Sequence, residues 1–210
     1  MTDFLSQTAA GWQLMTSLEL LAVLLALAYV LLAMKQSLWC WPAALLSTLL
    51  YVHIMWHSAL LSDALLQVYY AGMAVYGWWR WQQLRQPHHQ NKGMVCEWPW
   101  SRHCLLISCT FLAGLVLGQL MASYTHADFA YLDAQTTCFS IVATFLVARK
   151  LVSNWLYWVV IDAVSIYVYL QKNLYFTTVL FMLYTLIAVI GYFAWLRHYR
   201  QQSGTLVAVN

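Results

Sequence analysis

Charged residues are scarce in this 210-residue chain. They make up 8% of the sequence, against 63% hydrophobic residues, and the mean hydropathy is +0.64. A soluble domain usually carries about 25% charged residues, so these charges are too few to cover a globular surface in water. The sequence therefore predicts a protein integral to a membrane. The net charge of +3 is small and scattered along the loops, which argues against nucleic-acid binding.

Cysteine pairs and enzyme motifs are also missing. The five cysteines form no CxxC pair and their number is odd, which indicates buried reduced thiols and not a disulfide or metal framework. The sequence contains no phosphate-binding loop, no GxSxG and no HExxH, so neither ATP use nor hydrolysis has a basis in it. We predict that the protein is not an enzyme and that it needs no cofactor or metal.

One pair of histidines leaves an alternative open. His53 and His57 stand four residues apart in an apolar segment, and this spacing can ligate a metal or a haem. The chain would then be a histidine-ligated membrane redox protein. However, the pair lies near the end of its segment, and no second pair occurs in another apolar segment. Interfacial histidines are the plainer interpretation.

Seven apolar segments are long enough to be membrane helices. At about 1.5 Å per residue, each can cross roughly 30 Å of hydrocarbon. The predicted fold is an all-α membrane protein with seven transmembrane helices. The segments span residues 16–34, 38–56, 60–80, 103–121, 132–148, 153–171 and 175–196.

The basic residues predict an orientation in the membrane. If the N-terminus lies outside, nine of the ten lysines and arginines fall on the inner side and only Lys172 is left outside. An excess of positive charge on one side is typical of the cytoplasmic face. We therefore expect the N-terminus outside and the C-terminus in the cytoplasm.

A 47-residue stretch of the chain occurs twice. Lys35–Trp81 aligns without a gap with Arg149–Trp195, at a separation of 114 residues. Three helices followed by one more crossing leave both copies pointing the same way, which predicts parallel repeats joined by a linker helix, a 3+1+3 plan. The expected parts are a first repeat at 1–81, a cytoplasmic linker with the fourth helix at 82–131, and a second repeat with the tail at 132–210. Repeats of this kind commonly hold a substrate between them, so transport is the leading hypothesis.

An acidic residue inside an apolar segment is the strongest candidate for a functional site. Asp162 lies about midway between Lys150 and Lys172, roughly 15–18 Å from each, and so near the membrane midplane. Trp155 and Trp158 share its helical face. A carboxylate beside aromatic rings can orient a polar or cationic organic ligand. The alternatives are a structural aspartate bonded to a neighbouring helix and a proton relay, which would make transport proton-coupled.

Two other segments contribute polar side chains at similar depth. Gln67 and Tyr70 share one face of the third segment, and Gln67 can both donate to and accept from an amide or hydroxyl ligand, although a hydrogen bond between helices would also explain it. In the second segment Thr48 is the repeat equivalent of Asp162, with Tyr51 one turn further on. The repeat symmetry is thus broken at the midplane, as expected around an asymmetric ligand.

Several short motifs occur together in the two halves. They are Trp41-Pro42, Asp63…Gln67, Tyr76-Gly77-Trp78, and Asn154-Trp155-x-x-Trp158 followed by Asp162. With these motifs, the chain resembles the PnuC family of vitamin-precursor transporters over about residues 18–197. The segment 103–121 and the linkers match least.

The resemblance implies a seven-helix fold of two three-helix bundles, like a SWEET sugar transporter, assembled as a homotrimer in the lipid bilayer. It also implies facilitated diffusion of a phosphate-free vitamin precursor, most often nicotinamide riboside, across the bacterial inner membrane. A cytoplasmic kinase would then trap the ligand. The ligand-contacting helices of the family correspond here to Gln67, Tyr70, Trp155, Trp158, Asp162 and Tyr184.

The substrate within the family stays open. Relatives carry thiamine or riboflavin on the same scaffold. Nicotinamide riboside and thiamine each have a positive ring nitrogen, which suits Asp162 and the tryptophans, whereas neutral riboflavin gains less. We expect nicotinamide riboside, with thiamine as the alternative and riboflavin behind it. A purely structural membrane subunit is disfavoured by the polar residues at the midplane.

Overall fold

Every named element of the chain is an α-helix. The computed structural model describes residues 16–57, 61–85, 94–125 and 128–208, and these ranges contain seven helices. The expected all-α fold with seven helices is confirmed. The helices are α2 (Ser17–Met34), α3 (Cys40–His57), α4 (Leu61–Arg85), α5 (Trp100–Tyr124), α6 (Ala130–Ala148), α7 (Asn154–Gln171) and α8 (Tyr175–Ala208).

The helix bounds follow the internal repeat. α3 and α7 begin 114 residues apart, and so do α4 and α8, which is the separation of the repeated sequence. At their C-terminal ends, α4 and α8 continue furthest beyond the predicted apolar segments, because hydropathy falls at the membrane surface while the helix continues into polar sequence. α4 runs on to Arg85 and α8 to Ala208, so both helices extend beyond the last residues of the repeated stretch, Trp81 and Trp195.

Local sequence and backbone geometry define the start of α2 and the turns that follow α2 and α6. At the start of α2, Thr16 accepts the Glu19 N–H at 3.2 Å and donates its own N–H to the Glu19 carboxylate at 2.7 Å, a capping box. Beyond the ends of α2 and α6, Gln36 and Lys150 have φ values of 54° and 56°. Such values are uncommon for residues other than glycine. Their occurrence at repeat-equivalent positions shows that both halves make the same sharp turn.

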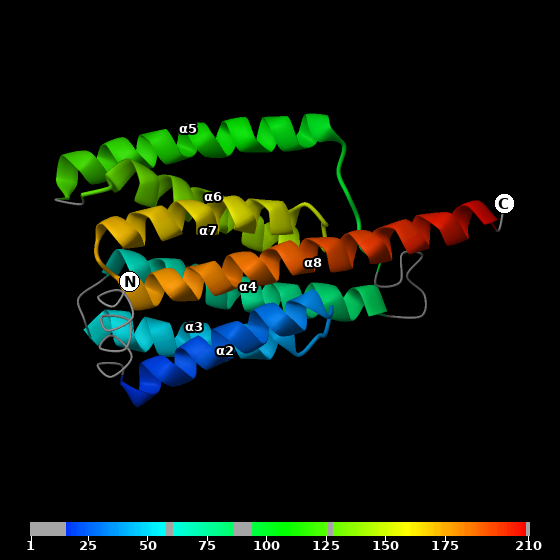
Figure 1. Cartoon of the computed structure of the whole chain (residues 1–210), viewed down its shortest axis with the longest axis horizontal. Helices are drawn as coiled ribbons and strands as arrows, with labels where there is room; N and C mark the ends of the chain where they lie inside the picture. Colours follow the sequence, from blue (N-terminus) through cyan, green and yellow to red (C-terminus); the bar gives the residue numbers. More distant parts are fainter. Residues whose placement is uncertain (1–15, 58–60, 86–93, 126–127, 209–210) are drawn as a thin grey trace.

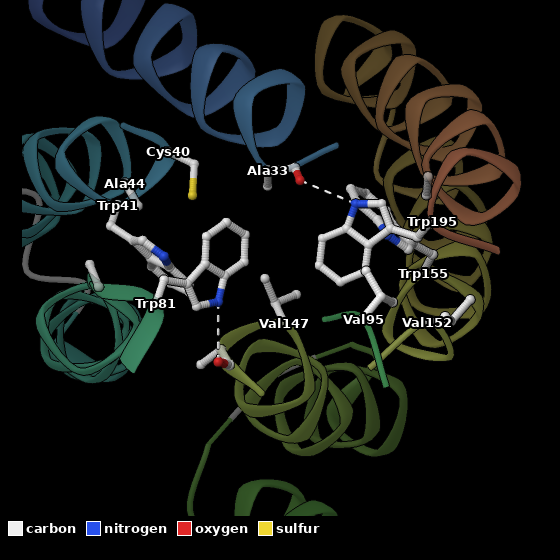
Figure 2. Close-up of a cluster of buried hydrophobic side chains, with 13 residues drawn as sticks. Ala33, Cys40, Trp41, Ala44, Trp81, Val95, Val147, Val152, Trp155 and Trp195 are labelled. Atoms are coloured by element: carbon white, nitrogen blue, oxygen red, sulfur yellow. Dashed lines mark hydrogen bonds between the residues drawn. The ribbon is translucent and has the colours of Figure 1, made fainter. Parts of the chain in front are cut away.

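Six of the helices form a closed ring. α2, α4, α6 and α8 run in one direction and α3, α5 and α7 in the other (Figure 1). One half of the ring consists of α2, α3 and α4, and the other of α6, α7 and α8. Within each half, consecutive helices pack together, and the halves meet where α4 contacts α6 and α2 contacts α8. In each case the third helix of one half contacts the first helix of the other. α5 lies outside the ring against α6 (Figures 1 and 2).

Four tryptophans fill the centre of the ring at one end of the bundle (Figure 2). Trp41 and Trp81 meet edge to face at 5.3 Å and 87°, and Trp155 and Trp195 repeat this arrangement at 5.5 Å and 86°. The two pairs touch through Trp81 and Trp195, whose ring centres lie 6.2 Å apart. Edge-to-face packing is a favoured geometry for aromatic rings. We call these four residues the tryptophan cluster.

The cluster also ties the two halves together by hydrogen bonds. The Trp81 indole donates to the carbonyl of Ala148 at 3.2 Å, and the Trp195 indole donates to the carbonyls of Ala33 at 3.3 Å and Met34 at 3.1 Å. These carbonyls belong to the last turns of α6 and α2, where helix carbonyls lack a partner in their own helix. Each half therefore completes a helix end of the other.

Two glycines set the position of the outer indoles. A Cβ at Gly77 would overlap the Trp41 ring, and one at Gly191 would lie 2.8 Å from the Trp155 ring. A side chain at either position must displace an indole that is at most 3% exposed. The glycines of both copies are therefore explained by packing.

We expect Gly77→Ala to destabilise the protein by about 1–3 kcal/mol, the usual cost of overpacking a core. Gly72 in the same helix has no neighbouring atom within 4 Å of a built Cβ, so Gly72→Ala is the matched control and should be neutral or stabilising, since alanine favours helix over glycine. Melting temperatures of the detergent-purified variants measure the difference. Equal shifts in the two variants would contradict this account.

The helices differ in the length of their apolar stretches. By length and composition, four described segments can cross a membrane, namely Ser17–Met34, Trp100–Tyr124, Ala130–Ala148 and Tyr175–Gln202. α3 offers a shorter apolar stretch, Cys40–Trp56. α4 and α7 carry the polar residues of the expected site, including Gln67 and Asp162, which lowers their hydropathy.

Candidate functional site

Asp162 is buried in the middle of α7. It is 3% exposed, and at 1.5 Å per residue it lies roughly 12 Å from either end of its helix. No hydrogen bond or ion pair to its carboxylate is found among the described residues. A buried carboxylate without a partner is costly, and such residues inside a membrane protein mark candidate binding or transport sites.

One tyrosine, Tyr184, lies near this carboxylate, and a second, Tyr51, lies near Tyr184. The phenol of Tyr184 on α8 lies within electrostatic range of both the Asp162 carboxylate and the hydroxyl of Tyr51 on α3. Both tyrosines are half-buried. The structure therefore brings three of the expected residues together, and they come from α3, α7 and α8. The group thus joins the two halves of the ring.

Thr48 is buried one turn before Tyr51. Its hydroxyl donates to the carbonyls of Ala44 at 2.9 Å and Leu45 at 3.0 Å in its own helix. Its proton is therefore used locally, which leaves the oxygen as an acceptor. This position, equivalent to Asp162 in the repeat, can accept a hydrogen bond but offers no charge.

The expected residues of α4 lie against α6. The hydroxyl of Tyr70 lies near the side chain of Ser140, and the neighbouring Tyr69 donates to the Ile141 carbonyl at 2.9 Å. Gln67 is half-buried one turn earlier on α4. Among the described residues, no hydrogen bond joins Gln67 or Tyr70 to the Asp162 group. The side chain of Asp63, the other polar residue of this motif, lies outside the described residues.

The two motif tryptophans of α7 have different surroundings. Trp155 belongs to the tryptophan cluster, is 3% exposed, and has one face against Gly191. Trp158 is half-buried and packs on the edge of the cluster. Of the two rings expected to stack on a ligand, only Trp158 has free area in this conformation. The indole N–H of Trp155 is buried without a hydrogen-bond partner among the described residues.

Sequence reasoning missed how one end of the ring is closed. α2 and α6 finish at this end, which carries Lys35, Arg80, Arg85, Arg149 and Lys150, and we call it the basic end. Lys150 points inward, is 4% exposed, and places its ammonium 4.5 Å from the centre of the Trp81 ring and 3.4 Å from the Gln36 side-chain oxygen. The repeat revealed Trp81 and Trp195 as a matched pair. Their carbonyl acceptors and the inward lysine carried no signal in the sequence.

Of the two histidines in the alternative interpretation, only His53 has a described side chain. Within the described residues, no group of three or more His, Cys, Asp or Glu side chains could hold a metal ion. His53 is exposed on α3, and the side chain of His57 lies outside the described residues.

Comparison with known proteins establishes the family. The family model described as "Nicotinamide mononucleotide transporter" matches residues 16–197. The chain belongs to this family. It is therefore a multi-pass membrane transporter and not an enzyme, and the family resemblance expected from the motifs is confirmed.

Three relatives illustrate the similarity to members of this family. The chain is 24% identical to the nicotinamide riboside transporter PnuC of Escherichia coli K12, in an alignment covering 76% of each protein. It is 23% identical to the riboflavin/roseoflavin transporter RibM of Streptomyces davaonensis, covering 88% of this chain and 87% of that protein. A crystal structure of the vitamin B3 transporter PnuC matches with a TM-score of 0.73 at 16% identity, over 95% of this chain and 90% of that one. This structural match confirms the fold.

Proposed function

We propose that the protein carries nicotinamide riboside into the bacterial cytoplasm by facilitated diffusion, and that a cytoplasmic kinase then traps the ligand by phosphorylation. The observation that carries this proposal is the buried Asp162 carboxylate near Tyr184, which in turn lies near Tyr51. A ligand with a positive ring nitrogen supplies the positive partner that this carboxylate lacks among the described residues. Aromatic side chains favour the same ligand through cation–π attraction. The E. coli relative, a nicotinamide riboside transporter by name, supports the choice.

The expected residues take distinct roles in this proposal. Gln67 bonds the amide or the sugar, Trp158 stacks on the pyridinium ring, and Asp162 pairs with its charge. Trp155 holds Trp158 in place from within the tryptophan cluster. The remaining members, Tyr51, Tyr184, Thr48 and Tyr70, offer hydroxyl oxygens to the ligand.

The mechanism that we propose is alternating access between two three-helix repeats, 1–81 and 132–210, with α5 in the linker at 82–131. The matched helix bounds, the common direction of α2 and α6, and the reciprocal tryptophan bonds support this division. The basic end faces the cytoplasm, following the positive-inside tendency, and the N-terminus lies outside. In this structure the bonds of Trp81 and Trp195 hold the basic end closed. Assembly as a homotrimer completes the proposal.

Two observations favour other substrates or energetics. The riboflavin/roseoflavin transporter among the relatives keeps riboflavin open as a substrate, beside thiamine, whose cationic ring suits Asp162. The isolated carboxylate would also suit a proton relay and hence proton-coupled uptake.

Two measurements on purified protein determine which vitamin is the substrate and whether its transport is coupled to protons. We expect calorimetric titration to show micromolar or tighter binding of nicotinamide riboside, with thiamine and riboflavin much weaker. In proteoliposomes, labelled ligand should equilibrate but not accumulate, whether or not a pH gradient is imposed. Tight binding of another vitamin alone would replace the substrate. Accumulation that collapses with the gradient would replace facilitated diffusion by proton coupling.

A further inference from the structure

A cavity of about 200 Å³ opens at the basic end, away from the Asp162 group. Arg80 of α4 and Arg149 of the α6–α7 turn line it together with Cys96 and Trp98 of the linker and Leu151. It is smaller than the roughly 300–1,000 Å³ of sites that enclose whole organic ligands. It therefore suits a small group of a ligand and not a complete vitamin.

The two arginines bring uncompensated charge to this cavity. No hydrogen bond or ion pair to either guanidinium is found within the described residues, and Arg149 is oriented by the Phe145 ring, 5.6 Å from its guanidinium carbon. The nearest acid along the linker, Glu97, is occupied elsewhere. Its carboxylate accepts the N–H groups of Ser153 at 2.8 Å and Trp98 at 2.9 Å, and it pairs with His103 at 2.9 Å.

The linker wall is fixed in place by its backbone. The Cys96 N–H donates to the Lys150 carbonyl at 2.9 Å, and the Cys96 carbonyl accepts the Val152 N–H at 3.0 Å. The Val95 N–H donates to the Gln202 side chain of α8 at 3.1 Å. The segment therefore spans from α8 to the α6–α7 turn and gives the cavity a preformed side.

The internal repeat does not duplicate the lining of this cavity. The repeat equivalents of Arg80 and Arg149 are Ala194 and Lys35, and the linker wall has no counterpart because the linker occurs once. The arginine pair is thus not a by-product of the internal repeat. Arg80 comes from the first half and Arg149 from the second, so a ligand held by both spans the boundary between the halves.

We propose that this cavity binds a phosphate group through Arg80 and Arg149. The planar guanidinium donates two parallel hydrogen bonds to phosphate oxygens, and two such groups at one cavity match a phosphate better than a carboxylate. The phosphate comes either from an anionic lipid headgroup, since basic pockets at the inner face of membrane proteins recognise such headgroups, or from a soluble phosphate ester. Binding to the cavity does not depend on which vitamin is transported.

The test is direct binding to the full-length protein. Glycerol 3-phosphate and inorganic phosphate are the soluble probes in calorimetry. Phosphatidylglycerol, against phosphatidylcholine, is the lipid probe in native mass spectrometry. We compare wild type with the double variant Arg80→Gln/Arg149→Gln. Lys35→Gln is the matched control, because it removes one basic charge at the repeat equivalent of Arg149.

We expect wild type and Lys35→Gln to bind at least one of these probes, and the double variant to bind it tenfold or more weakly. Binding of phosphatidylglycerol alone assigns the headgroup, and binding of the soluble probes assigns a free phosphate ester. If the double variant does not fold, Arg80→Lys serves instead, since it keeps the charge and loses the paired donors, and its affinity should also fall. The proposal is overturned if no probe binds above its phosphatidylcholine or chloride reference, or if both arginine variants bind like wild type. Vitamin binding is unaffected by either result, so this failure is distinct from failure of the transport proposal.

Discussion

Asp162→Asn should weaken binding of a cationic vitamin precursor tenfold or more, while raising the melting temperature of the ligand-free protein. Asparagine keeps the shape of the side chain but removes its charge. The free protein then no longer buries a carboxylate that lacks a partner among the described residues, which is a cost in the folded state. The bound protein loses the charge that pairs with the ligand. The two effects have opposite signs, and calorimetry together with thermal melts in detergent measures both.

The matched control is Asp133→Asn. Asp133 is half-buried at the start of α6, and its carboxylate pairs with Lys172 at 3.4 Å. Partly exposed pairs contribute only about 0–1 kcal/mol, so this variant should leave both affinity and melting temperature nearly unchanged. Unchanged affinity in Asp162→Asn would remove Asp162 from the site. Equal loss in both variants would point to a general loss of negative charge and not to a specific contact.

The fold could be predicted from the sequence because the two signals that determine it are repeated along the chain. Apolar runs mark each helix, and a membrane leaves a helix as the simplest way to satisfy backbone hydrogen bonds. The duplicated stretch aligns Gln36 with Lys150 and Gly77 with Gly191, and the structure shows the same turn and the same close packing at these paired positions. The end of α8 in polar sequence could not be predicted, since hydropathy marks where a helix leaves the membrane but not where the helix itself ends.

The candidate site was only partly accessible from the sequence. Asp162 stands out because an acid in an apolar helix is rare. The structure places Tyr184 near it and Tyr51 near Tyr184. Helical periodicity gave the face of Trp155, but not the glycine of another helix that covers its ring. That information lies in how helices far apart in the chain pack together. The inward position of Lys150 could not be predicted for the same reason, because a group of basic residues between two apolar segments is typical of a solvated loop.

Lys150→Gln should remove a pH dependence of stability that wild type shows in alkaline solution. Burial, together with the charge of nearby Arg85, lowers the pKa of Lys150 from 10.5 to about 8, although the thiols of Cys40 and Cys96 oppose the shift. Between about pH 8 and 10.5 the unfolded chain therefore binds more protons at this residue than the folded chain. The free energy of unfolding should rise with pH across this window, by about 3 kcal/mol. Below pH 8 the lysine is charged in both states and the full cost of burying its charge is present.

Glutamine is the informative replacement because the other half of the ring has Gln36 at the equivalent position, with the same left-handed backbone. The variant therefore keeps a side chain that this turn accommodates, while it removes the ammonium from the Trp81 ring. Unfolding at pH 7, 8, 9 and 10 should give a flatter profile for Lys150→Gln than for wild type. Lys35→Gln, which alters an exposed lysine, should retain the wild-type slope, and the tyrosines and thiols that titrate in the same range contribute alike to all three proteins. Parallel profiles for wild type and Lys150→Gln would show that Lys150 reaches water, and that the basic end is less tightly closed than the contacts of Lys150 with Trp81 and Gln36 indicate.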